Sequence, residues 1–215
     1  MQTYRRHWSP ILKIAFIDHY DSFSYNVLDW LQRSAKISLE IRHITCDNEL
    51  ALARLKSNPI PTVISPGPGS PTDYPLTLEL LNSIYTKVPV LGICLGHQML
   101  GHLAGHTVSK AQEPWHGTIE EIHVHHNNWF TAGLPASFRA TVYHSLIVTM
   151  NATSSDAPKA LHLDPWLALA FDTKKQLMML SHRELPVASV QFHPESFGSQ
   201  SLEVLAQNFL GTVKL

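Results

Sequence analysis

Short apolar runs alternate with amphipathic segments through the first half of the 215-residue chain, and this alternation constrains its fold most. The run ILKIAFID (11–18) has the length and composition of a buried strand. The segment after it has apolar residues at helical spacing, namely Phe23, Val27, Leu28 and Leu31. Strand–helix pairs follow in the same order: SLEIRHIT and NELALARLK, PTVIS and YPLTLELLNSIY, VPVLGIC and LGHQMLGHLAG. Such connections cover both faces of a parallel sheet, so the first half predicts an α/β fold with an open, mainly parallel sheet flanked by helices.

Polar and glycine residues mark where the expected helices begin and end. Asp21 or Ser22 is expected to cap the first helix, and Asn48 or Asp47 the second. The helix LGHQMLGHLAG is expected to end at Gly105.

The pattern changes after Gly105. The segments TIEEIHVHH, FRATVYHSLIVT, LALAFD, LMMLSH and VASVQFH resemble strands and are separated by Pro, Asp, Asn and Gly, with little helix between them. They predict antiparallel strand additions in the C-terminal half, and SLEVLAQNFLG predicts a closing amphipathic helix. Because the sequence contains no internal repeat or linker, we expect one domain over 11–215, preceded by an extension over 1–10.

Composition bears on compartment and partners. The formal net charge is -1 and only 15% of residues are charged, so no electrostatic attraction to nucleic acid or to an anionic membrane is expected. No apolar stretch approaches the ~20 residues that span a bilayer, and MQTYRRHWSP lacks the apolar run of a secretory signal. Two cysteines do not make a disulfide framework. We therefore expect a cytoplasmic protein in a reducing compartment.

The histidines raise the question of a metal site. The chain has 14 of them, with one cluster in HVHHNNW. That cluster lacks the Cys or carboxylate partners of a strong site, and His123 and His125 alternate as on a strand face. A surface strand is the favoured interpretation, and no metal or other cofactor is expected in this chain.

The candidate nucleophile is Cys94, in Gly92-Ile93-Cys94-Leu95-Gly96 between an expected strand and an expected helix. A nucleophile on such a sharp turn needs small neighbours, as in the G-x-S-x-G elbow of hydrolases. A helix N-terminus favours a thiolate, and the Leu95 N–H would point into the same space as an oxyanion donor. The alternative from these five residues alone is a buried structural cysteine beside packing glycines.

The segment VQFHPES supplies a base and a group to orient it. His193 and Glu195 are two residues apart, and Pro194 favours an extended backbone at His193, so both side chains are expected on one side. Glu195 can then hold the tautomer of His193 that accepts a proton from Cys94. The alternative is a surface histidine at a strand end.

The loop SPGPGSP (65–71) is rich in glycine and proline and follows an expected strand. It lacks the Gly-Lys-Ser/Thr of a phosphate loop and the third glycine of a dinucleotide fingerprint. The functional interpretation is a second oxyanion donor, the Gly67 N–H, and the alternative is a rigid turn.

Together these motifs resemble the class I (triad) glutamine amidotransferases, and within them the glutaminase subunits of chorismate-utilising synthases. The matching stretches run from about Ile14 to about Leu210: IDHYDSFSYNVLDWL, VISPGPGSP, PVLGICLGHQML, VYHSL and SVQFHPES. The resemblance implies a flavodoxin-like fold and hydrolysis of L-glutamine by Cys94, His193 and Glu195. By motif position it implies an oxyanion hole at Gly67 and Leu95. The residues it implies for substrate binding are Gly67, Pro68, Gly69, Gln98, Ser145 and Leu146.

The resemblance also implies a partner. In such proteins ammonia passes to a synthase subunit that binds chorismate and Mg²⁺ and makes anthranilate or 4-amino-4-deoxychorismate. The segment DHYDSFSYN resembles one on the partner-facing side, where Tyr20, Phe23 and Tyr25 are either interface or core residues.

The chain departs from the family pattern at two places near the expected site. His116-Gly117-Thr118 replaces a common His-Gly-Lys, and FGSQ replaces an Ile-x-Thr-like stretch after HPES. Both concern the identity of the partner rather than the triad. Two further function classes stay open: a free-standing Cys hydrolase acting on γ-glutamyl or peptide substrates, and a non-catalytic regulatory subunit.

Overall fold

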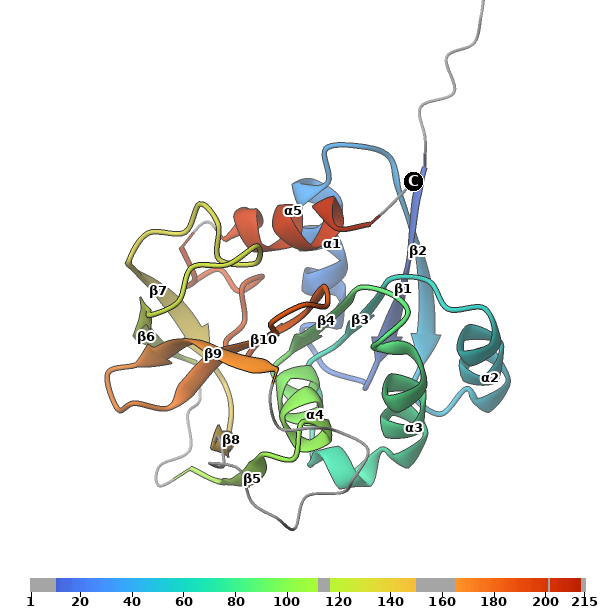
Figure 1. Ribbon diagram of the computed structural model, residues 1–215, viewed down its shortest axis with the longest axis horizontal. Coiled ribbons are helices and arrows are strands. Elements are labelled where there is room, and N and C mark those ends of the chain that lie inside the picture. The colour runs from blue at the N-terminus through green and yellow to red at the C-terminus, as the bar shows by residue number, and fades with distance from the viewer. Residues whose placement is uncertain (1–10, 112–116, 150–164, 201, 214–215) are drawn as a thin grey trace, which may run out of the picture.

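A nine-stranded sheet forms the centre of the protein, in a computed structural model that describes residues 11–111, 117–149, 165–200 and 202–213 (Figure 1). The strand order is β2-β1-β3-β4-β11-β10-β9-β6-β7. These strands are β1 Leu12–Asp18, β2 Leu39–Thr45, β3 Thr62–Ile64, β4 Val90–Ile93, β6 Thr118–Val124, β7 Ser137–Val142, β9 Trp166–Asp172, β10 Leu177–His182 and β11 Val187–Val190. A separate two-stranded sheet pairs β5 Thr107–Lys110 with β8 Leu146–Thr149.

Five neighbouring strands, from β2 to β11, run parallel, and helices cover both of their faces. The helices are α1 Ser24–Ser34, α2 Glu49–Ser57, α3 Pro75–Ile84, α4 Leu95–Leu103 and α5 Glu203–Gly211, with a 3₁₀ turn η1 Pro71–Asp73. Helix α1 packs with α5, while α3 packs with both α2 and α4. Side chains of β1 alternate between the two cores: Ile14 and Phe16 join one cluster, Ala15 and Ile17 the other. The predicted parallel α/β architecture is confirmed.

The rest of the sheet is antiparallel, as predicted for the C-terminal half. In the order β11, β10, β9, β6 and β7, each strand pairs antiparallel with the next. One expected strand is wrong: FRATVYHSLIVT is not continuous, because β7 ends at Val142 and β8 begins at Leu146 in the other sheet. The chain leaves the large sheet here so that Val148 can pack on Gly101 of α4, where an added Cβ would lie 2.6 Å from the Val148 side chain.

The helix ends agree with the sequence except at α1. Asn48 caps α2 by accepting from the Ala51 N–H at 3.1 Å, as predicted. Helix α4 ends two residues before Gly105, which has a positive φ of 78°. Helix α1, however, begins at Ser24, with Phe23 at its cap position and no side-chain cap. The Ser24 hydroxyl instead donates to Asp18 at the end of β1, which fixes the start of the helix beside the strand.

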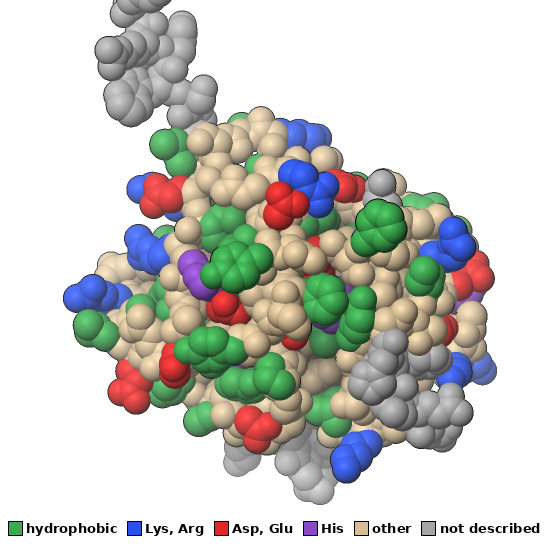
Figure 2. Space-filling view, turned by 180° about the vertical axis from the view of Figure 1, so that it is seen from behind, with side chains coloured by type: hydrophobic (Ala, Val, Ile, Leu, Met, Phe, Trp, Pro, Cys, Tyr) green, Lys and Arg blue, Asp and Glu red, His purple; other side chains and the backbone are tan. Residues whose placement is uncertain are grey.

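Three features of the described residues bear on membranes, charged partners and metal ions. None of their helices is both long and apolar enough to cross a bilayer. On the face shown in Figure 2, basic and acidic side chains lie interspersed rather than in a patch of one sign. Within the described ranges, no three or more His, Cys, Asp or Glu side chains are grouped so that they could hold a metal ion. The predicted extension over 1–10 lies outside those ranges.

Candidate active site

Cys94 lies at the turn between β4 and α4 with a strained backbone. Its φ of 51° and ψ of −97° are rare for a residue with a side chain, and such strain costs on the order of 1–3 kcal/mol. The Cys94 N–H donates to the Val190 carbonyl at 2.8 Å, which ties the turn to β11. The thiol therefore stands at the carboxyl edge of the parallel strands, where α/β folds place their ligands.

The two flanking glycines allow this turn for different steric reasons. A Cβ on Gly92 would lie 2.4 Å from the Gly96 carbonyl oxygen, inside the turn itself. A Cβ on Gly96 would lie 2.7 Å from the carbonyl oxygen of Ile64 in β3. The predicted need for small residues on both sides of Cys94 is confirmed, because a Cβ on either glycine would collide with a backbone carbonyl oxygen.

His193 and Glu195 form a buried pair beside Cys94. Nδ1 of His193 lies 2.7 Å from a Glu195 carboxylate oxygen, and the side chains are 2% and 0% exposed. Burial alone would lower the pKa of His193, but the Glu195 charge and the Cys94 sulfur outweigh it and raise that pKa well above its ordinary value. The Nε2 atom is buried and meets no acceptor with full hydrogen-bond geometry in the described structure. The arrangement favours a charged imidazolium next to the sulfur.

Two aromatic rings pack against the His193 ring. Phe23 lies 5.4 Å and Tyr143 5.0 Å from it, centroid to centroid, and both meet it edge-on. Phe23 thus belongs to the site, whereas Tyr20 and Tyr25 are 61% and 73% exposed. Sequence reasoning missed Tyr143, whose one signal is its place directly before His144 and Ser145 in VYHSL.

The glycine–proline loop lies against the start of α4. A Cβ on Gly67 would lie 2.5 Å from the His19 Cβ and 2.7 Å from a Leu95 methyl group. His19 buttresses this loop, since its ring nitrogens lie 3.0 Å from the Ser65 hydroxyl and 3.1 Å from the Thr77 hydroxyl. The close approach brings Gly67 and Leu95, the two expected oxyanion donors, next to each other. Gly69 has a positive φ of 75°, and the Pro68 carbonyl accepts from the Tyr74 hydroxyl at 2.9 Å.

The other residues expected to bind substrate, Gln98, Ser145 and Leu146, lie next to one another. The Gln98 side-chain amide, one turn into α4, donates to the Leu146 carbonyl at 3.3 Å. Ser145 is exposed beside it, and its carbonyl accepts from the Ala111 N–H at 2.8 Å. Gln98, Ser145 and Leu146 are therefore neighbours, although Gln98 comes from α4, Leu146 begins β8 and Ser145 directly precedes that strand.

Comparison with known proteins decides the family. The pattern of the family described as Glutamine amidotransferase class-I matches residues 15–212. The chain belongs to this family. Proteins named anthranilate synthase component 2 are similar to it: one from Azospirillum brasilense is 38% identical, over 94% of this chain and 96% of that protein. One from Pseudomonas putida is 35% identical, over 92% and 96%.

Two solved structures share the class I amidotransferase fold. A protein from Thermoplasma acidophilum, described as a GMP synthase component, superposes with a TM-score of 0.75 at 22% identity, over 94% of both chains. A glutamine amidotransferase from Thermotoga maritima gives a TM-score of 0.63 at 18% identity, over 86% of this chain and 76% of that one. These likenesses agree with the mixed sheet seen here.

The segment FGSQ, an expected departure from the family pattern, joins the His193 loop to β7 through hydrogen bonds. The Ser199 hydroxyl donates to the His193 carbonyl at 2.6 Å and accepts from the Thr141 N–H at 3.0 Å. Gln200 exchanges two hydrogen bonds with the Arg139 backbone, at 2.9 and 2.7 Å. Phe197 is fully exposed. Of the other departure, Thr118 begins β6, and His116 lies outside the described residues.

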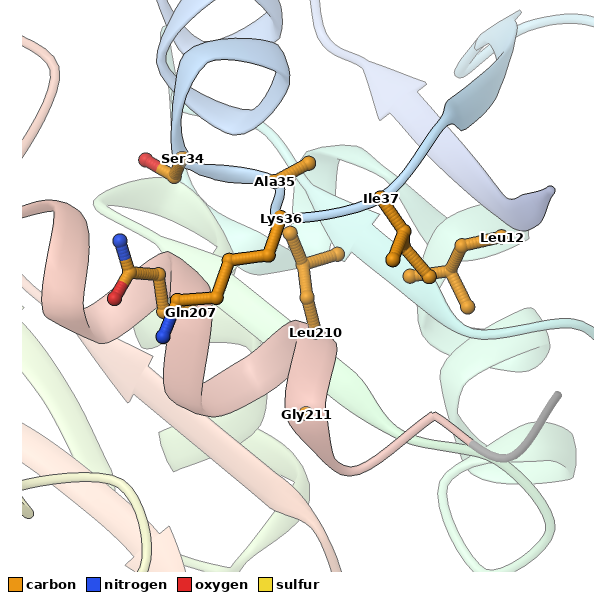
Figure 3. A pocket seen from close by; sticks show the side chains of 8 residues that line it. All are labelled: Leu12, Ser34, Ala35, Lys36, Ile37, Gln207, Leu210 and Gly211. Atoms are coloured by element: carbon orange, nitrogen blue, oxygen red, sulfur yellow. The ribbon is translucent and has the colours of Figure 1, made fainter. Parts of the chain in front are cut away.

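An apolar pocket lies elsewhere in this amidotransferase (Figure 3). It has a volume of about 150 Å³ and lies between the start of β1, the segment after α1 and the end of α5. Leu12, Ile37 and Leu210 point into it, and Lys36 is its one ionisable side chain among those lining it. It lies at the amino end of β1, whereas Cys94 lies at the carboxyl end of the parallel strands, so it is not part of the candidate active site.

Proposed function

We propose that the chain is the glutaminase subunit of anthranilate synthase and hydrolyses L-glutamine through Cys94, His193 and Glu195. The observation that carries this proposal is a strained, buried cysteine next to an equally buried histidine–glutamate pair with a raised histidine pKa. Structural cysteines need neither the strain nor the charged pair. The names of the Azospirillum and Pseudomonas relatives support the assignment to anthranilate synthase.

The proposed reaction begins from a thiolate–imidazolium pair, because the raised pKa of His193 favours its protonated form. The Cys94 sulfur attacks the side-chain amide carbon of glutamine and forms a C–S bond, while the carbonyl electrons move onto oxygen. His193 then gives its proton to the leaving nitrogen, and ammonia departs as the C–N bond breaks. Water, deprotonated by His193, attacks the γ-glutamyl thioester, releases glutamate and restores the thiolate.

The charge on the tetrahedral oxygen would be held by the N–H groups of Gly67 and Leu95. Leu95 is the first residue of α4, where backbone N–H groups have no acceptor within the helix. Gly67 packs against Leu95 with no space for a side chain, so its backbone can approach a ligand closely. The backbone from Gly67 to Gly69, together with Gln98, Ser145 and Leu146, would hold the glutamine.

The ammonia would pass to a chorismate-binding synthase subunit, which would supply the Mg²⁺, so the proposal assigns no cofactor to this chain and places it in the cytoplasm. A relative from Thermotoga maritima, named bifunctional protein TrpGD, is 33% identical over 92% of this chain and 32% of its own length. In that protein the matching region is joined to further sequence. Here we propose a separate partner, and the exposed Tyr20, Tyr25 and Phe197 are candidates for its contact surface.

The test mixes the purified chain with an anthranilate synthase component 1, chorismate, Mg²⁺ and either glutamine or ammonium. Anthranilate from both nitrogen sources with the wild type, and from ammonium alone with Cys94→Ala, is the expected result. A parallel reaction uses the synthase subunit for 4-amino-4-deoxychorismate, and product only there would move the assignment to that branch. Turnover of γ-glutamyl peptides without turnover of glutamine would overturn the proposal in favour of a free-standing hydrolase.

A further inference from the structure

Gln191 approaches the Cys94 sulfur from the short segment after β11 that also carries His193. It directly follows β11, is fully buried, and donates its backbone N–H to the Met178 carbonyl at 2.9 Å. Gln191 and His193 are two residues apart in the bend that follows β11, and both side chains reach the Cys94 sulfur. This segment therefore brings two side chains, and not only the histidine, to the nucleophile.

The amide end of Gln191 contacts the sulfur itself. Its Nε2 lies 3.7 Å from the Cys94 Sγ, a hydrogen-bonding distance for sulfur. Its Oε1 is buried without a hydrogen-bond partner in the described structure. A buried amide with one unpaired end costs free energy, and an apolar side chain of the same length would fill this place more cheaply. Polar groups retained at such a cost are typical of functional sites.

We propose that Gln191 is a further catalytic residue, whose side-chain N–H donates a hydrogen bond to the Cys94 thiolate. This inference rests on the proposed glutaminase function. In the resting enzyme the bond would stabilise the negative sulfur and hold it in one orientation, with the His193 imidazolium as its other partner. When the sulfur attacks the amide carbon, its charge moves to the substrate oxygen and the N–H···S bond weakens. No proton leaves Gln191 in any step.

The opposite orientation of the amide makes an opposite prediction. If Oε1 faced the sulfur, it would accept from the neutral thiol and disfavour the thiolate. Removal of the amide would then make Cys94 more reactive at neutral pH rather than less. The direction of the change therefore separates the two arrangements.

The experiment measures the rate at which iodoacetamide alkylates Cys94 between pH 5 and pH 9, in wild type and in Gln191→Leu. Mass spectrometry of the two cysteine peptides separates Cys94 from Cys46, which serves as an internal reference thiol. We expect the Cys94 rate at pH 6 to fall roughly tenfold and its pH midpoint to rise by about one unit, since bonds to charged groups are worth this much. Gln207→Leu, the same change on α5, should leave the profile unaltered.

Gln191→Met, which keeps the unbranched shape, serves if Gln191→Leu does not fold, as judged by rapid alkylation of Cys46. An unchanged midpoint, or one that falls, in a folded variant overturns the proposal. The glutaminase assay of Cys94→Ala keeps this result separate from the proposed function. Retained hydrolysis in Cys94→Ala would reject the function, whereas an unchanged alkylation profile with Cys94-dependent hydrolysis would reject only the role of Gln191.

Discussion

Cys94 and Cys46 both follow a strand of the parallel half, yet their surroundings differ. Cys94 comes directly after β4 and Cys46 directly after β2, and they are 7% and 9% exposed. Burial and the neighbouring Asp47 raise the pKa of Cys46, which keeps it a neutral thiol. Cys94 instead faces a histidine whose pKa is raised well above the ordinary value.

A buried position directly after a strand is therefore not enough to make a cysteine a nucleophile. Three features present at Cys94 are absent from what is described around Cys46: a positive φ, the buried His193–Glu195 pair, and the Gln191 amide at the sulfur. The first aims the sulfur out of the sheet, and the others favour its charged form. Each feature can be removed separately, and the matching change elsewhere in the chain provides the control.

Replacing each cysteine by alanine is the test of this comparison with the largest expected effect. Cys94→Ala should lower glutamine hydrolysis by roughly 10⁴-fold or more, because loss of a nucleophile removes covalent catalysis altogether. Cys46→Ala should leave the rate close to that of the wild type, since its thiol has no catalytic partner among the described residues. Glutamate release in the presence of the synthase subunit is the measurement. Comparable losses in both variants would show that the two strand ends do not differ as described.

The turn geometry can be broken without touching the thiol. Gly96→Ala places a methyl group 2.7 Å from the Ile64 carbonyl oxygen, and the overpacking should lower the free energy of unfolding by about 3 kcal/mol. Gly211→Ala, at the end of α5, meets nothing within 4 Å and should be neutral or slightly stabilising. Urea unfolding of both variants measures the difference. A Gly96→Ala variant as stable as Gly211→Ala would mean that the turn tolerates a side chain.

The Cys94 end of the sheet was predictable from sequence because its signals are local. The alternation of strands and helices, the glycines around Cys94 and the spacing of His193 and Glu195 each depend on backbone periodicity or steric fit within a few residues. The structure brings the expected substrate residues Gln98 and Leu146 together as well. For these two, family motif position was the signal, since 48 residues separate them.

The features that the sequence did not reveal depend on contacts between distant segments. Gln191 reaches Cys94 across 97 positions, and its one signal was a polar residue inside the apolar run VASVQFH. Phe23 could be read as core or interface, and only the tertiary structure places its ring on His193. The break between β7 and β8 was hidden because VYHSL is apolar enough to pass for a continuous strand.

The stability of the fold in acid tests the protonation of a buried histidine in α4, the helix that directly follows Cys94. Burial, with His144 and His106 nearby, lowers the pKa of His97 in α4 to about 3, so the fold holds it neutral. The stabilisation that comes from burying a neutral His97 is fully present above the unfolded-state pKa of 6.5. It is lost as pH falls towards 3. At pH 5 the loss is roughly 2 kcal/mol for this one side chain. The raised pKa of His193 has the opposite sign, since its stabilisation is lost as pH rises through that pKa, so it does not cause the acid loss.

His97→Asn should therefore lose about 2 kcal/mol less stability than the wild type between pH 7 and pH 5. Urea unfolding at the two pH values gives each difference, so a constant cost of the substitution cancels. His102→Asn, on the exposed side of the same helix, should behave as the wild type does. Equal acid losses in His97→Asn and the wild type would show that the buried ring is not what makes this end of the sheet acid-sensitive.

The smallest expected effect concerns the anchoring of the His193 backbone, a feature without a counterpart in what is described around Cys46. Ser199 bonds the His193 carbonyl at 2.6 Å and the Thr141 N–H at 3.0 Å, so Ser199→Ala should loosen the histidine against β7. We expect kcat for glutamine hydrolysis to fall roughly fivefold, which corresponds to about 1 kcal/mol. KM should be unchanged because Ser199 is not among the substrate residues.

Ser199→Thr keeps the hydroxyl and should restore most of the rate. Ser83→Ala removes a similar hydroxyl-to-carbonyl bond, 2.7 Å to Leu80 in α3, and should leave kcat unaltered. A raised KM with unchanged kcat in Ser199→Ala, or a Ser199→Thr variant as slow as the alanine, would mean that FGSQ acts on substrate access and not on the placement of His193.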